Sequence, residues 1–169
     1  MPRLHALELL PDAEGEAVVR RDWQALRDAG LPSMLDHTGG TNTPHLTVLA
    51  LPSIDEAVEQ QATAQLGAVL PVVVRPSGVA LLSGEKVSVV RLLDVPASLT
   101  DAVHTLRDAV TGDRHPGWLP HLTLGRRISR SDAQRAIDAV GYADVSISLV
   151  GLRRWNPEQR TVRSLLPGR

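Results

Sequence analysis

The tetrapeptide Pro-His-Leu-Thr occurs twice in this chain, at residues 44–47 and 120–123. Each copy is followed by an apolar residue, and such short apolar runs are typical of strands. On a strand, side chains two positions apart point to the same face and lie about 6.5–7 Å apart. His45 and Thr47 therefore share one face, while the leucine between them points to the other. In the second copy, His121 and Thr123 likewise share one face, and Leu122 points to the other. The repeat predicts two similar strands, each polar on one side and apolar on the other.

The remaining sequence alternates between strand-like and helix-like patterns. We expect strands at residues 6–10, 45–51, 72–74, 79–82, 86–93, 119–127, 145–155 and 161–166. Helices are expected at residues 14–29, 53–67, 97–110 and 131–140, the second of them opened by a capping box at residues 53–56. The order of motif strand, serine-capped helix and strand occurs twice, at 44–82 and 120–155. Helices mixed among hairpin-connected strands indicate an α+β fold with antiparallel or mixed sheets.

Pairing the two motif strands about a pseudo-twofold axis would gather two imidazoles and two hydroxyls around one anion. The four side chains are those of His45, Thr47, His121 and Thr123. A neutral imidazole can take a proton from an attacking water or hydroxyl, and a protonated one can give a proton to the leaving oxygen. The hydroxyls can donate to phosphate oxygens as charge builds. The pattern predicts phosphodiester cleavage; the alternative is a binding module that holds a nucleotide or phosphate in the same cleft without turnover.

This motif pair resembles the 2H phosphoesterase superfamily, which includes the bacterial RNA 2',3'-cyclic phosphodiesterases known as 2'-5' RNA ligases. The resemblance covers nearly the whole chain. It implies a bilobal fold, with two pseudo-symmetric lobes around a central cleft and helices outside. It also implies that His45, Thr47, His121 and Thr123 are catalytic, that the substrate is a 2',3'-cyclic phosphate or a 2'-5' linkage, and that no cofactor is needed. RNA-directed members often have an Arg-Trp pair before the first motif, where this chain has Thr-Asn-Thr at residues 41–43.

Four further residues are candidates for substrate binding: Arg126, Trp118, His37 and His115. The resemblance implies Arg126, although strict alternation from His121 would put it on the wrong face unless Gly125 permits a bulge; Arg127 is the competing residue. Trp118 precedes the second motif and could stack on a base, as could Trp155. His37 and His115 lie in the loops that lead into the two motifs.

The amino-acid composition limits the classes of ligand and partner that the chain is expected to bind. The 169 residues suit a single domain, residues 1–169. The absence of cysteine excludes disulfides and a thiolate nucleophile, and the histidines lack carboxylates at metal-ligand spacing, so we expect no metal. A net charge of −1 and few aromatic residues argue against an extended single-stranded RNA footprint and favour a nucleotide or an RNA end. We expect a cytoplasmic monomer with no membrane partner, since the longest apolar run is short.

Overall fold

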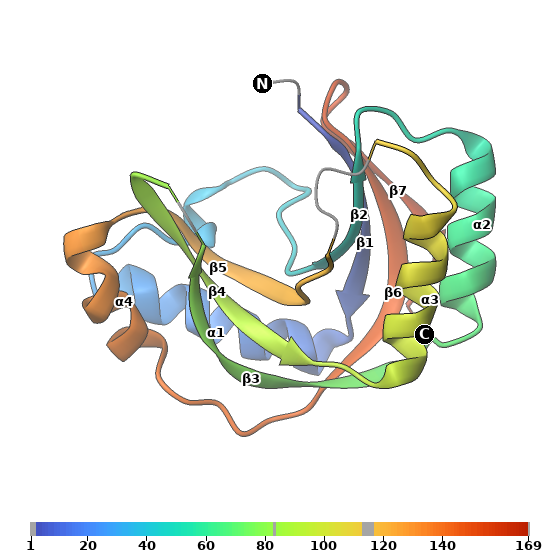
Figure 1. Cartoon of the computed structure of the whole chain (residues 1–169). Coiled ribbons are helices and arrows are strands. Elements are labelled where there is room, and N and C mark those ends of the chain that lie inside the picture. The colour runs from blue at the N-terminus through green and yellow to red at the C-terminus, as the bar shows by residue number, and fades with distance from the viewer. Residues whose placement is uncertain (1–2, 83, 113–116, 169) are drawn as a thin grey trace.

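The apolar strand patterns pair into one antiparallel sheet, with helices packed on its outer surfaces (Figure 1). The computed structural model describes residues 3–82, 84–112 and 117–168. Its strands are β1 (His5–Pro11), β2 (Leu46–Leu51), β3 (Val72–Leu82), β4 (Lys86–Asp94), β5 (His121–Ser129), β6 (Ile147–Asn156) and β7 (Thr161–Leu166). Its α-helices are α1 (Ala13–Asp28), α2 (Glu56–Gly67), α3 (Ala97–Asp108) and α4 (Ala133–Val140), and two 3-10 turns are η1 (Met34–Asp36) and η2 (Arg130–Asp132).

The strand order is β1-β2-β5-β4-β3-β6-β7, and β1 also pairs with β6. Because β1 pairs with both β2 and β6, the first six strands of this order form a closed ring of pairings, and β7 is added at β6. Two lobes result, one built on β1, β2, β6 and β7 and the other on β3, β4 and β5. In Figure 1, α2 and α3 lie side by side along the first lobe, whereas α1 and α4 lie at the second. The expected α+β architecture with helices outside an antiparallel sheet is confirmed.

The lobes meet at two junctions: β3 pairs with β6, and β2 pairs with β5 through the residue pair Leu46 and Leu122. Both leucine side chains are fully buried, as the alternation in the repeated tetrapeptide predicts. Because the leucines fill the core, the histidine and threonine on either side of each leucine are turned to the opposite face of the sheet. The seam between the lobes therefore carries the polar side chains of both motifs.

Three local expectations are wrong. Helix α2 begins after Asp55, whose carboxylate accepts a hydrogen bond of 2.9 Å from the amide of Val58, so the predicted box at residues 53–56 does not form. A carboxylate at this position also complements the positive end of the helix dipole. Ser131 lies in η2 rather than capping α4. Residues 72–82 form one strand instead of two, because a register shift between Pro76 and Gly78 absorbs the proline.

No helix in the described residues is long and apolar enough to cross a membrane.

Candidate active site

The antiparallel register at the seam brings the two motifs together. Since Leu46 pairs with Leu122, extending the register by one residue on either side sets each histidine beside the threonine of the other copy. A pseudo-twofold axis thus passes through the leucine pair. The rings are close enough that the charge of His45 contributes to lowering the pKa of His121. The predicted gathering of His45, His121 and their threonines on one face follows from this register.

Each motif fixes its histidine ring in the same way. Nδ1 of His45 lies 2.7 Å from the carbonyl oxygen of Thr43, and Nδ1 of His121 lies 2.7 Å from the carbonyl oxygen of Leu119. A carbonyl oxygen only accepts hydrogen bonds, so each Nδ1 carries the proton. Nε2 of each ring is therefore the atom left for acid or base chemistry. The proline between carbonyl and histidine has a fixed φ, which limits the freedom of this short turn.

A tryptophan side chain is hydrogen-bonded to the backbone of each motif strand. The indole Nε1 of Trp118 donates a 3.0 Å hydrogen bond to the carbonyl of Thr47, and Nε1 of Trp23 donates a 3.0 Å hydrogen bond to the carbonyl of Thr123. Trp23 is fully buried, and Trp118 is half-buried against the core. The two contacts follow the pseudo-twofold symmetry of the motifs. Stacking of Trp118 on a base stays a prediction, since its polar atom already has a structural partner.

The two histidines differ in electrostatic environment. Burial lowers the pKa of His121, and the positive charges of His45 and Arg126 lower it further, while the hydrogen bond to Leu119 opposes the shift. A lowered pKa favours the neutral ring at neutral pH. His121 is thus suited to accept a proton.

His45 faces a buried carboxylate instead. Oε1 of Glu8, on β1, lies 3.4 Å from Nε2 of His45, and Oε2 of Glu8 accepts a 2.7 Å hydrogen bond from Nε of Arg153, on β6. Glu8 and Arg153 are only 5% and 7% exposed. Neither Glu8 nor Arg153 is among the site residues that the sequence predicts. The available signal was a lone carboxylate within the apolar run of residues 6–10.

Arg126 reaches the site because β5 bulges. Val90 pairs with Thr123 and Val89 with Gly125, so one residue of β5 is unpaired between them, and a second shift follows before Ile128. Arg127 adopts a positive φ of 60° at this second irregularity. The expected bulge near Gly125 is confirmed. Arg126 lines the cavity beside His45 and acts electrostatically on His121; its role as a phosphate ligand stays a prediction.

A cavity of about 660 Å³ opens beside His45. Glu8, Thr47 and Arg153 form part of its wall, and Trp155 lies on the same face of β6 as Arg153. The segment that follows η1 contributes further lining residues, which include His37. The volume of the cavity is in the range of small-ligand sites. Its lining includes the polar side chains of Glu8, Thr47 and Arg153 together with His45. His115, the remaining substrate-binding candidate, lies outside the described residues.

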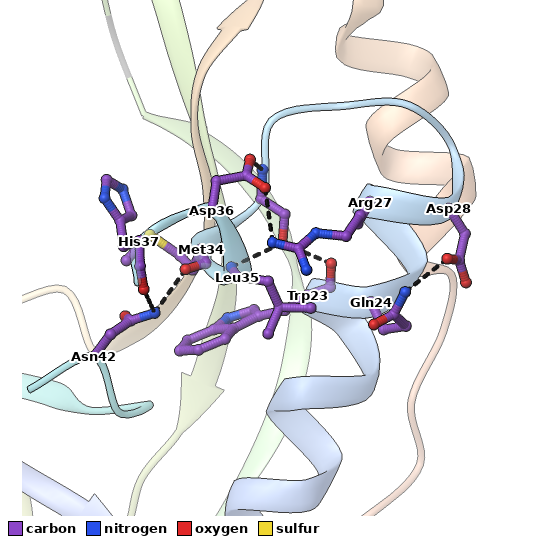
Figure 2. A network of polar contacts seen from close by, with 10 residues as sticks. Trp23, Gln24, Arg27, Asp28, Met34, Leu35, Asp36, His37 and Asn42 are labelled. Carbon is purple, nitrogen blue, oxygen red and sulfur yellow. Dashed lines mark hydrogen bonds and ion pairs between the residues drawn. The ribbon is translucent and has the colours of Figure 1, made fainter. Parts of the chain in front are cut away.

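The segment from η1 to Asn42 is held in place by polar contacts (Figure 2). The Asn42 side-chain amide donates hydrogen bonds of 2.7 and 2.8 Å to the carbonyls of Met34 and His37. Asp36 pairs with Arg27 at 2.9 Å, and a hydrogen bond from the Ser33 amide together with this pair lowers the pKa of Asp36. These contacts hold this part of the cavity wall against α1, at the second lobe.

A profile of the 2'-5' RNA ligase superfamily matches residues 14–163 of the chain. The chain belongs to this superfamily. The match extends across both motifs and both lobes, so the 2H phosphoesterase resemblance of the sequence is confirmed. No curated protein matches the chain in sequence.

Solved structures share the fold of this superfamily member at low identity. Usb1 of Kluyveromyces marxianus, in a structure with uridine monophosphate, has a TM-score of 0.56 at 13% identity, with 98% of this chain and 99% of that chain covered. LigT of E. coli, in a complex with NADP+, has a TM-score of 0.54 at 17% identity, with 97% and 94% covered. The near-complete coverage of both chains indicates that the whole architecture is shared.

Among the described residues of this superfamily member, no group of three or more histidine, aspartate or glutamate side chains is arranged to hold a metal ion. The residues gathered at the seam are two imidazoles, two hydroxyls and the guanidinium of Arg126. These groups can bind an anion and exchange protons with it.

Proposed function

We propose that this chain is a metal-independent phosphodiesterase that hydrolyses a 2',3'-cyclic phosphate or a 2'-5' phosphodiester of an RNA end or a small nucleotide. The observation that carries the proposal is the pair of rings at the seam, each with Nδ1 bonded to a backbone carbonyl and Nε2 left for chemistry. Two identically tethered imidazoles in different electrostatic surroundings suit the acid-base cleavage of a phosphodiester. Membership of the superfamily supports the same reaction class.

In the proposed reaction, water attacks phosphorus and the bond from phosphorus to one ribose oxygen breaks. His121, whose pKa is lowered by burial, accepts the proton of the attacking water at Nε2. His45, beside the Glu8 carboxylate, donates a proton from Nε2 to the departing ribose oxygen. The hydroxyls of Thr47 and Thr123 donate to the non-bridging oxygens, where negative charge accumulates. The proton count balances, and the product is a phosphomonoester with a free hydroxyl.

Arg126 gives this site its permanent positive charge. Its guanidinium lines the cavity next to His45 and can bind a phosphate oxygen through two parallel hydrogen bonds. The nucleoside would lie in the adjoining cavity, between Trp155 and the segment that holds His37. The bound uridine monophosphate of Usb1 and the NADP+ of LigT support a nucleotide as the ligand class.

Alanine variants of the two histidines, assayed on 2',3'-cyclic nucleotides, test the proposal. We expect His45→Ala and His121→Ala each to lower kcat by about 10²–10⁴-fold, which is roughly 3–5 kcal/mol of barrier. His104→Ala is the matched control, because His104 is exposed on α3, and it should retain full activity. Activity should also persist in a chelator.

Two results would contradict the proposal. Near-full activity in both histidine variants would remove them from catalysis. Tight nucleotide binding by calorimetry, without turnover of any cyclic or linear phosphodiester, would instead indicate a binding module.

A further inference from the structure

The two halves of the site are not equivalent, and the difference lies in the strands that flank the motif strands. In the first half, β1 pairs with β2 so that Glu8 is opposite Thr47, after a register shift that leaves one residue of β2 unpaired. In the second half, β4 pairs with β5 so that Val90 is opposite Thr123, after the same kind of shift. Glu8 and Val90 are therefore related by the pseudo-twofold axis, and a carboxylate in one lobe corresponds to an apolar side chain in the other.

We propose that Glu8, held by Arg153, is a positioning residue that keeps His45 as the proton donor of the site. The inference rests on the proposed function and deepens it, since it names the group that makes two identical motifs perform opposite proton transfers. Glu8 acts through His45 and is not required to touch the substrate.

The contact between Glu8 and His45 is electrostatic in character. A separation of 3.4 Å is longer than the usual range for an N–H···O hydrogen bond, yet it is well within the distance at which opposite charges stabilise each other. At this distance the carboxylate can stabilise a proton on Nε2 of His45 without holding it in a short hydrogen bond. The proton remains available for a leaving oxygen.

Arg153 is the charge partner of this buried carboxylate. Glu8 is 5% exposed, and a carboxylate buried to this extent is usually paired with an opposite charge. Its two oxygens have separate partners: Oε2 accepts from Nε of Arg153 at 2.7 Å, and Oε1 faces His45. Register on β1 places Glu8 directly opposite Arg153 as well as Thr47. The pair is thus fixed by strand pairing on both sides of β1.

Other charged or titratable groups also lie around His45. Arg126 of β5, and Asp36 and His37 at η1, line the same cavity. His121 of β5 is close enough to His45 for the two rings to interact electrostatically. Arg126 and His121 oppose a positive charge on His45. Asp36 is exposed and already pairs with Arg27 at 2.9 Å. Glu8 is therefore the buried carboxylate in direct contact with Nε2.

The test compares the pH dependence of kcat/KM for the wild type, Glu8→Gln and Glu8→Asp. Glutamine keeps the size of the side chain and an acceptor for Arg153 but removes the charge. We expect the basic limb of the profile to move to lower pH by about one to two units in Glu8→Gln, because an adjacent opposite charge shifts a titration by that order. On the basic side this is a loss of about tenfold or more. Glu8→Asp, which retains the charge, should restore part of the shift.

Glu59→Gln is the matched control. Glu59 is also buried, at 3% exposed, and is bound by Arg154 at 2.9 Å and by Arg163, but it lies on α2 away from the cavity. This variant shows how the loss of a buried carboxylate that is paired with arginine affects the activity through the stability of the fold alone. Its pH profile should superimpose on that of the wild type. A profile for Glu8→Gln that coincides with that of Glu59→Gln would overturn the proposal.

An NMR titration of the unmodified chain keeps the proposal testable if Glu8→Gln does not fold. The ring signals, assigned with single histidine variants, should show that His121 is the first of the two site imidazoles to lose its proton as pH rises. The reverse order would overturn the proposal. Because this measurement needs no turnover, it separates the fate of the Glu8 inference from that of the proposed phosphodiesterase activity.

Discussion

Gly125 is the residue on which the second half of the site depends, and its substitution gives the sharpest prediction. A Cβ atom at this position would lie 2.5 Å from the carbonyl oxygen of Pro32 and 3.0 Å from methyl groups of Ile128 and Leu26. An ordinary carbon-to-oxygen contact is about 3.3 Å or longer, so the two backbones would have to separate by roughly 0.8 Å.

The backbone that carries this oxygen is poorly placed to retreat. Leu31 and Ser33, on either side of Pro32, are buried, and the Ser33 hydroxyl donates a 2.6 Å hydrogen bond to the Trp23 carbonyl. Overpacking of this kind costs about 1–3 kcal/mol. For a chain of this size, such a cost lowers Tm by about 2–12 °C. Arg126 follows directly on the strained residue, so we also expect a raised KM for a cyclic nucleotide in Gly125→Ala.

Gly78→Ala is the matched control for this prediction. Gly78 also lies beside a strand irregularity, but a Cβ there would have no neighbour within 4 Å. Thermal unfolding of the two variants should separate them, with Gly78→Ala unchanged or slightly stabilised through the unfolded state. A Tm for Gly125→Ala within a degree of the wild type would refute the close approach and the role assigned to the bulge.

Three further predictions concern the supports of the site. Trp118→Phe removes the indole donor to the Thr47 carbonyl and should lower the free energy of unfolding by about 1–3 kcal/mol, measured by denaturant titration, whereas a changed KM with unchanged stability would favour base stacking. Asp22→Asn leaves Arg91 buried without its charge partner and should destabilise the chain by about 3–5 kcal/mol; an unchanged denaturation midpoint would contradict this. Because the fold lowers the pKa of His121 from 6.5, His121 takes up a proton at higher pH in the unfolded chain than in the folded one. The free energy of unfolding should therefore fall as pH drops below about 6.5, and should fall less in His121→Asn. Equal pH dependence of this free energy in the two proteins, measured by chemical denaturation at pH 5–7, would contradict the shift.

Sequence periodicity predicts the features of the structure that depend only on residues close together in the chain. The alternation in Pro-His-Leu-Thr predicts which side chains face the core, and Leu46 and Leu122 are fully buried. The helical stripe of residues 97–110 predicts α3 to within two residues of its end. These features depend on a repeat of two or about 3.6 residues, which a short window of sequence contains.

Sequence reasoning was weaker at element ends and irregularities. The serine at residue 53 satisfies a capping pattern, yet Asp55 forms the cap, because two residues within one turn offered competing acceptors for the same free amides. Residues 72–82 contain a proline and a glycine that suggest a break, but pairing with β6 at one end and β4 at the other holds them in one strand. Such choices are decided by partners distant in sequence.

The sequence by itself determined which groups the motifs carry: two histidines and two threonines on strand faces, in matched copies. The tertiary structure decided how these groups are placed relative to one another. The pairing of Leu46 with Leu122 sets the two copies face to face, a bulge at Gly125 turns Arg126 toward the cavity, and pairing on β1 delivers Glu8 and Arg153 to one histidine only. The physical reason is that register between strands is fixed by contacts across the whole fold, and a shift of one residue would turn every side chain to the other face.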